Sequence, residues 1–416
     1  MKSILLLSLV IPVFAFASGP HLPLDLSFEE SQELWSEHKS TTKFKSLKTK
    51  TDPFVAKAIA GGEILGKWLK KINENRESDN QLLLSSSSSS SRGAGIPIDK
   101  PSKYGPKTIK LRIEKILATA PKEMLDVIYN ELPMTVKNPV EDKVFIEFGR
   151  KISGTYQSAV RWETNIKKWL PYYKKNQRRD VRGFYHLIKE ENLDQKLKNF
   201  SSLSSQDQER LSGHLYKICL NDKVEGKTCT TRLDKARKKG TVLKFKNKYW
   251  SGATKNWNSF WLISKPRKDV VWNSTSPNTM KVTFKDPKNE KIANWLKENI
   301  EDEFKTDTWQ MEFNFKENGT GLAYLEFKAG VTPHVKSGNI IVMDKNSSID
   351  EYSVKWTIRH EYGHILRLPD CYFEFYDEKE EVAVNYQLNV KDLMCSRSGD
   401  MNERIYKELK RVYYNK

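Results

Sequence analysis

The chain has few cysteines, few histidines and no long apolar run beyond its first residues. Its 416 residues include 4 cysteines and 7 histidines. After residue 17, no segment approaches the roughly 18 apolar residues that a membrane-spanning helix requires. No internal repeat is visible, and no zinc-finger, helix-turn-helix or aromatic RNA-binding motif occurs. These absences argue against a repeat protein, a membrane-spanning protein and the common classes of nucleic-acid-binding protein.

The first residues predict a secretory signal peptide over 1–17. Lys2 supplies the positive charge at the start, an apolar run follows over 4–16, and Ala15-Phe16-Ala17 has the A-x-A form of a cleavage site. We therefore expect a secreted or periplasmic protein that is cleaved near Ala17 and has no transmembrane segment.

The segment His360-Glu361-Tyr362-Gly363-His364 places two histidines four residues apart with a glutamate between them. On an α-helix, residues i and i+4 lie on the same face, so both imidazoles can bind one metal ion. In the H-E-x-x-H pattern of zinc hydrolases, the glutamate takes a proton from the attacking water. Apolar residues at three-to-four-residue spacing predict this helix, and a capping box over 348–351 predicts its start. Gly363 within the helix predicts close packing, which we expect to be against a sheet.

Two further features extend the motif. Asp370 follows His364 by six residues, and Asp392-Leu393-Met394-Cys395 has the sequence of a methionine turn. With these features the C-terminal part of the chain resembles the metzincin zinc endopeptidases. Aspartate at the last motif position, followed by Tyr372, is most similar to the snapalysin type. The resemblance implies one catalytic Zn²⁺ bound by His360, His364 and Asp370, with Glu361 as general base and Tyr372 as a phenol near the developing oxyanion.

The sequence departs from the family pattern at two positions. Arg367 stands where the family has glycine at a sharp turn, and arginine is disfavoured at a positive φ. Ser396, and not tyrosine, follows Met394 by two residues, so the additional tyrosine ligand of astacin-like and serralysin-like members is absent. Packing of Tyr372 as an ordinary aromatic is an alternative to its catalytic role. Alternative third ligands are His334, Glu374, Glu378, Glu380 and Glu381.

The four cysteines suit an oxidising compartment. Three pairings are possible, and we favour Cys219–Cys229 with Cys371–Cys395. The second pair would tie the residue after Asp370 to the residue after Met394. It would thereby hold the ligand loop against the methionine turn.

Charge divides the chain unevenly. Residues 268–416 contain 22 Lys+Arg and 25 Asp+Glu, a balance of −3, whereas 18–267 contain 48 and 28, a balance of +20. The serine run at 85–91 predicts a linker. We therefore expect a polar segment over 18–92, a basic, mainly helical accessory or pro-domain over 93–267, and a zinc metalloprotease domain over 268–416. The basic excess favours anionic envelope polymers as partners, or docking of the basic region onto the acidic one.

The order of predicted elements indicates an α+β fold. Before 268 we predict helices over 28–38, 53–72, 109–118, 122–132, 156–170 and 205–220, and strands within 242–264. After 268 we predict strands over 280–284, 310–315, 322–327 and 339–343, helices over 288–303 and 402–413, and an irregular segment after Asp370. This arrangement is what the metzincin resemblance implies for a twisted mixed sheet with an active-site helix.

The predicted function is hydrolysis of peptide bonds in a protein or peptide substrate. Zinc would lower the pKa of a bound water, and Glu361 would transfer its proton to the leaving amine. An extended substrate would pair with an edge strand between Leu322 and Val335. The alternatives are a secreted zinc hydrolase of a non-protein envelope amide and a non-catalytic secreted binding protein that acts through its basic region.

Overall fold

The computed structural model describes residues 50–77, 80–82, 84, 95–328, 331, 333–345, 349, 352–396 and 399–415. The predicted signal peptide, the helix expected over 28–38, the serine run and the capping box lie outside these residues. Within the described residues, no helix is long and apolar enough to cross a membrane.

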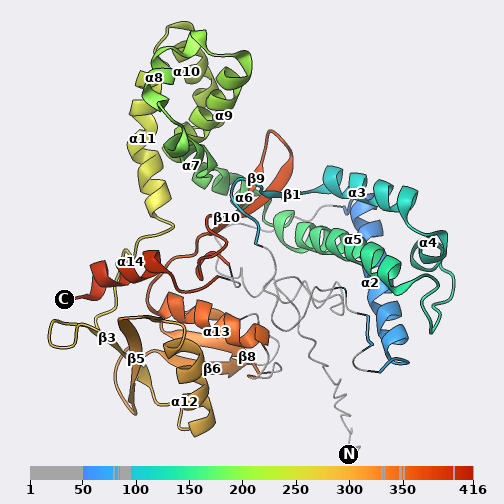
Figure 1. Cartoon of the computed structure of the whole chain (residues 1–416). Coiled ribbons are helices and arrows are strands. Elements are labelled where there is room, and N and C mark those ends of the chain that lie inside the picture. Colours follow the sequence, from blue (N-terminus) through green and yellow to red (C-terminus); the bar gives the residue numbers. More distant parts are fainter. Residues whose placement is uncertain are drawn as a thin grey trace, which may run out of the picture.

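The first helical unit packs its helices around two clusters of buried side chains (Figure 1). They are α2 (Pro53–Asn73), α3 (Pro106–Thr119), α4 (Lys122–Tyr129) and α5 (Asp142–Arg161). Asp52 caps α2 by accepting hydrogen bonds from two amides of its first turn, and Pro53 occupies a position where an N–H is dispensable. Trp68 of α2 packs edge to face on Phe145 of α5, with ring centroids 5.2 Å apart. The helices predicted over 53–72, 109–118 and 122–132 are confirmed, whereas the helix predicted over 156–170 coincides only with the end of α5, which begins at Asp142, and with the segment that follows it.

A second helical unit has its own core and lies apart from the first unit in space (Figure 1). Two connecting segments, η1 (Trp162–Ile166) and α6 (Leu170–Asn176), lead to it through η2 (Gln177–Arg179). Its elements are α7 (Arg182–Lys189), α8 (Leu193–Lys198), η3 (Phe200–Ser202), α9 (Ser205–Asn221), α10 (Gly226–Lys238) and α11 (Val242–Asn258). The predicted disulfide Cys219–Cys229 is confirmed, and it joins α9 to α10.

The prediction of strands within 242–264 is wrong, because most of this segment forms α11. The residues that α11 buries are Val242, Phe245, Tyr249 and Ala253, at intervals of three and four. This is the period of a helix face and not of a strand. Aromatic and β-branched residues, which favour strands, concealed that period.

A mixed sheet forms the C-terminal region. β3 (Thr279–Lys285) runs parallel to β5 (Trp309–Lys316), with the crossover helix α12 (Glu290–Leu296) and η4 (Lys297–Glu301) between them. Short strands β2 (Val270–Val271) and β4 (Lys305–Thr306) pair antiparallel with β3 and β5. A bridge from Phe284 to Ala323 continues the sheet to β6 (Tyr324–Lys328), which is parallel to β8 (Ile340–Asp344). β7 (His334–Lys336) pairs antiparallel with β8 and ends the order β6-β8-β7.

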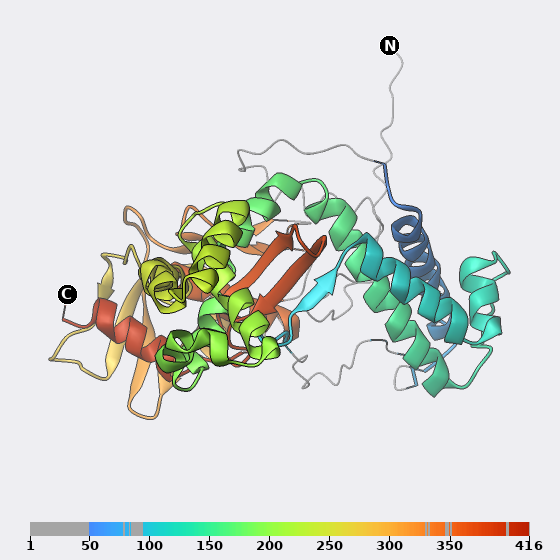
Figure 2. The same ribbon diagram turned by 90° about the horizontal axis from the view of Figure 1, so that it is seen from above.

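The segment after Asp370 is more regular than predicted. β9 (Tyr372–Asp377) and β10 (Val382–Gln387) form an antiparallel hairpin, so the prediction of an irregular segment is wrong there. β1 (Ser102–Tyr104), from the first helical unit's side of the chain, adds antiparallel to β10 (Figure 2). The final helix, α14 (Glu403–Tyr413), is confirmed. Helical units combined with small mixed sheets confirm the α+β class, and residues before 268 supply a strand to the C-terminal hairpin.

Candidate metal centre

Helix α13 (Tyr352–Ile365) carries the H-E-x-x-H segment and is held by an apolar face. Tyr362 is fully buried, and its ring lies among those of Phe284, Phe304 and Phe313. His360 and His364 are displaced around the helix from Tyr362 by about half a turn, so they lie on the other side. Their ring centroids are 4.8 Å apart. Packing of the tyrosine against the sheet therefore turns both imidazoles toward the loops that follow the helix.

The helix ends in a Schellman motif at Arg367. The Leu368 amide donates to the Gly363 carbonyl and the Arg367 amide to the His364 carbonyl, each at 3.0 Å. Arg367 has φ +67°, so arginine adopts the conformation that favours glycine. Its guanidinium lies over Gly338, where no side chain intervenes, and donates to Asn339 Oδ1 at 3.3 Å. These contacts hold the arginine in the left-handed turn, and the chain then returns Asp370 toward the histidines.

The three predicted ligands converge on one point. Asp370 Oδ1 lies 3.2 Å from His360 Nε2 and 3.1 Å from His364 Nε2. The other ring nitrogens are engaged, because His360 Nδ1 lies 2.9 Å from the Leu393 carbonyl and His364 Nδ1 lies 2.9 Å from the Leu368 carbonyl. A carbonyl oxygen only accepts, so each Nδ1 carries the hydrogen. In the neutral rings both Nε2 lone pairs then face Asp370.

This arrangement requires a positive charge at its centre. Asp370 Oδ1 is buried and has no hydrogen-bond donor when both histidines are neutral. Without a metal, a proton must take that place: burial lowers the pKa of His364, but the charge and hydrogen bond of Asp370 raise it to about 9. Burial conversely favours the neutral form of Asp370, and the charge of His364 outweighs it and holds the pKa of that carboxyl well below its usual range. Two imidazoles and one carboxylate are a donor set that suits zinc with one coordination position open. The residues present therefore fit such an ion.

The methionine-turn segment packs directly beneath the helix. Met394 is fully buried, and a Cβ on Gly363 would overlap its sulfur atom. The expected packing of Gly363 against a sheet is therefore wrong, because its close neighbour is a loop residue. The predicted disulfide Cys371–Cys395 is confirmed, with Cα atoms 4.3 Å apart, and the Cys371 amide donates to the Met394 carbonyl at 3.0 Å. The loop that follows Asp370 is thus fastened to the turn beneath the histidines.

Asp392 organises this turn, a role that sequence reasoning missed. Its buried carboxylate accepts from the Met394 amide at 2.9 Å, from Asn402 Nδ2 at 2.9 Å and from Arg404 Nε at 2.8 Å. The hydrogen bond from the Met394 amide to Asp392 spans Leu393, whose carbonyl orients His360. Asp392 is the first residue of the methionine-turn segment, but no local spacing indicated that Arg404 of α14 would reach it. Cys371 and Cys395 also surround Asp392, yet their sulfur atoms are bonded to each other, so this group is no thiolate metal site.

Glu361 and Tyr372 lie beside the three ligands. Glu361 is buried, and its charge also raises the pKa of His364, which indicates that the carboxylate is near that ring. Tyr372 is 47% exposed, and its ring centroid lies 6.2 Å from that of His360. The ring of Tyr372 therefore lies near His360 and is not fully buried.

The alternative third ligands lie elsewhere. Among the described residues, His334 is outside the group formed by His360, His364 and Asp370. The four glutamates belong to the β9–β10 hairpin and pair with cations from the region before 268. These pairs are Arg161–Glu374, Lys174–Glu378, Lys103–Glu380 and Lys107–Glu381.

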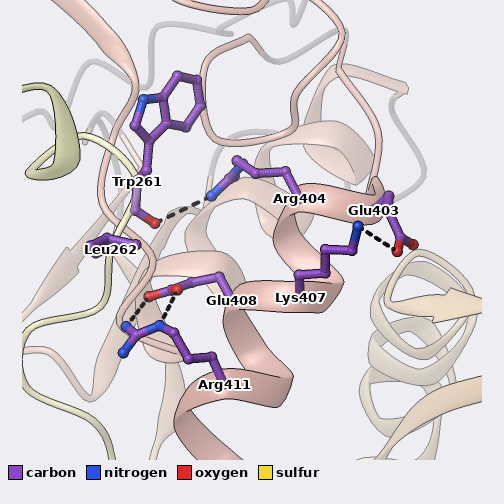
Figure 3. A pocket seen from close by; sticks show the side chains of 7 residues that line it. All are labelled: Trp261, Leu262, Glu403, Arg404, Lys407, Glu408 and Arg411. Carbon is purple, nitrogen blue, oxygen red and sulfur yellow. Dashed lines mark hydrogen bonds and ion pairs between the residues drawn. The ribbon is translucent and has the colours of Figure 1, made fainter.

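A separate cavity lies against α14 (Figure 3). It has a volume of about 410 Å³ and lies between Trp261–Leu262 and the helix. None of its lining residues belongs to the ligand group. Arg404 connects the two places, because it donates to the Trp261 carbonyl at 3.3 Å and also holds Asp392.

Comparison with known proteins gives no relative: no family model, no curated protein and no solved structure matches this chain.

Proposed function

We propose that the protein is a zinc-dependent endopeptidase with one catalytic ion held by His360, His364 and Asp370. The convergence of three acceptor atoms, all within 4.8 Å of one another, supports this proposal most directly. Each imidazole is oriented by a backbone carbonyl at its other nitrogen, which is the outer support that histidine ligands of metals usually have. When bound, zinc supplies Lewis-acid chemistry: it acidifies water and polarises a carbonyl.

The chain's own residues would carry the proton transfers. Glu361 is the general base in this proposal: it takes a proton from the attacking water and delivers it to the nitrogen of the leaving amine. The exposed phenol of Tyr372 donates a hydrogen bond to the oxygen that becomes negative during attack. Met394 closes the site from below with an apolar, fully buried side chain. Water that is not activated is thereby kept from this side of the site.

A peptide substrate fits the neighbouring strand. Among the described residues, β7 pairs with β8 alone and stands at one end of the order β6-β8-β7. An extended peptide can add to such an edge through its backbone, which favours a peptide over a small amide. The edge strand lies partly within the segment 322–335 that the sequence indicated, and β7 packs near α13.

Zinc analysis of the purified full chain, followed by digestion of a broad peptide library, tests the proposal. We expect one zinc per chain and cleavage that chelators abolish. Glu361→Gln should retain zinc and lose turnover by several orders of magnitude, whereas His360→Ala and Asp370→Ala should lose zinc. Turnover that survives in Glu361→Gln would refute the mechanism, and full zinc binding in Asp370→Ala would refute the ligand set. Hydrolysis of envelope amides without any peptide cleavage would favour the other hydrolase class.

A further inference from the structure

The stretch 235–268 contains cations and no acidic residue. It holds eleven lysines and arginines between Asp234 and Asp269: Lys235, Arg237, Lys238, Lys239, Lys244, Lys246, Lys248, Lys255, Lys265, Arg267 and Lys268. Most of them lie on α10, α11 and the turn that joins these helices. Residues 226–258, which form this helical pair and its turn, hold 10 Lys+Arg and 1 Asp, so a balance of +9 out of the +20 over 18–267 lies there.

The exposed lysines of this pair form two rows. The α10 row is Lys227, Lys235 and Lys238, and the α11 row is Lys244, Lys248 and Lys255; all six are exposed. Within each row the spacing keeps the side chains on one side of the helix. α10 buries Cys229, Leu233 and Ala236, and α11 buries the face that begins at Val242, all in the same core. Each row therefore lies opposite a buried face, and the two rows point away from a shared core in different directions.

Among the described residues, the six lysines form no ion pair, although the exposed Asp234 lies on the same side of α10 as its row. Lys246, on another side of α11, pairs with Asp194 at 3.0 Å. By contrast, the cations that contact the β9–β10 hairpin are paired with its glutamates. Docking onto the C-terminal region thus uses other residues and leaves both rows available.

The helices that carry the two rows are joined by a buried core and a disulfide, and they lie apart from the candidate metal centre. A continuous buried cluster and the Cys219–Cys229 disulfide hold α9, α10 and α11 together. Figure 1 shows these helices at the end of the molecule furthest from α12, α13 and their sheet. Because residues 268–416 carry a balance of −3, an anionic partner is attracted to this end and not to the sheet.

The chemistry of this surface restricts the class of partner that it can bind. The large exposed apolar side chains of the described residues include none on α10 or α11, so insertion into a bilayer has no anchor there. Trp250 is only partly buried, but Lys246 Nζ lies 4.4 Å above its ring, which hinders base stacking. Six separate ammonium groups suit repeated anionic groups that are recognised by charge alone.

We propose that α10 and α11 form a binding surface for a flexible polyanion, a polymer with phosphate or similar anionic groups repeated along its chain. Since the rows point in different directions, a flexible chain can contact both of them, whereas a flat bilayer can neutralise only one at a time. This surface is independent of zinc and of peptide hydrolysis. It would hold the protein on an anionic polymer by the end opposite its sheet.

Binding of the full chain to long-chain inorganic polyphosphate tests this surface. One variant replaces the α10 row (Lys227→Gln, Lys235→Gln, Lys238→Gln) and another the α11 row (Lys244→Gln, Lys248→Gln, Lys255→Gln). Counterion release predicts that each variant loses roughly ten- to a hundredfold in affinity near 0.1 M salt, with a salt slope smaller by about 2. The matched control (Lys67→Gln, Lys115→Gln, Lys137→Gln) removes the same charge from exposed lysines of the first helical unit and should change affinity by less than about threefold.

Three results would overturn the proposal. Row variants that bind polyphosphate as the control does would show that charge alone, without position, attracts the polymer. Tighter binding to vesicles of anionic lipid, lost in only one row variant, would indicate a membrane surface. More than tenfold preference for a single-stranded oligonucleotide over polyphosphate of equal charge would indicate base recognition. Equal losses in both rows, with circular dichroism unchanged, would support a flexible polyanion.

Discussion

Replacement of Gly363 by alanine should destabilise the candidate metal centre, although alanine ordinarily stabilises a helix. Gly363 lies within α13 between the two histidines, and its missing side chain makes room for Met394. The same substitution at Gly154 of α5 or Gly213 of α9 meets no atom within 4 Å. These two helical glycines are therefore matched controls for intrinsic helix propensity.

The expected changes in stability have opposite signs at position 363 and at the two control positions. Alanine gains about 0.5–1 kcal/mol over glycine in a helix interior, which is the full effect that we expect in the two controls. At position 363 the new methyl group must displace the Met394 sulfur within a fully buried site, and overpacking of this kind costs about 1–3 kcal/mol. Because all three variants share the gain in helix propensity, Gly363→Ala should be less stable than either control by the overpacking cost, about 1–3 kcal/mol.

Hydrogen exchange with mass spectrometry measures this locally, in the presence of a chelator so that metal binding does not contribute. Peptides that cover α13 and 388–396 should exchange faster in Gly363→Ala, whereas peptides of α5 and α9 should exchange at the wild-type rate or more slowly in their own variants. Zinc affinity should also fall, because Met394 and the Leu393 carbonyl that orients His360 belong to one turn. Slower exchange of α13 in Gly363→Ala would refute the packing argument, since it would mean that Met394 does not fill the space beside the glycine.

Three further predictions concern the same region. In the presence of a chelator, the stabilisation that protonated His364 gains from Asp370 should be complete below pH 6.5, the ordinary pKa of histidine, and lost as the pH rises through about 9. The free energy of unfolding measured against pH checks this prediction. Zinc should remove the effect, because ligation requires the neutral ring. Replacement of both Cys371 and Cys395 by serine should lower the free energy of unfolding by about 2–5 kcal/mol and weaken zinc binding, whereas the same change at Cys219 and Cys229 should leave zinc affinity unaltered. Arg161→Glu should speed hydrogen exchange in β9, because Glu374 of that strand accepts two hydrogen bonds from Arg161, at 2.7 and 2.8 Å, and the double variant Arg161→Glu with Glu374→Arg should restore part of the protection; unchanged exchange in Arg161→Glu would indicate that the hairpin holds without this pair.

The placement of the three candidate ligands could be predicted because it depends on local geometry. The spacing from His360 to His364 is one helical turn, and the six residues from His364 to Asp370 are few enough to return a carboxylate to the helix end. Arg367 did not prevent this return, because Gly338 and Asn339 accommodate its guanidinium in the left-handed turn. That accommodation comes from the β7–β8 turn, which the sequence around residue 367 does not reveal.

Contacts between distant segments could not be predicted in this way. Asp392 acquires its role from Arg404 and Asn402, which reach it only after α14 has packed. α11 was misread because its aromatic residues have a high strand propensity, and only their burial against α9 and α10 decides the period. Local patterns thus indicated which residues could hold a metal, while tertiary packing determined what supports them.

The lysines and arginines that make 18–267 more basic than 268–416 include two groups with different structural roles. A small set of cations from 103–174 is paired with the glutamates of the β9–β10 hairpin, next to the added strand β1. Such pairs give the hairpin four partners and leave its carboxylates unsuited to bind a metal. The lysines of α10 and α11 take no part in this contact and lie at the end of the molecule furthest from α12 and α13 (Figure 1). Net charge alone could not separate these two groups, because it records neither which cations are paired nor where the unpaired ones point.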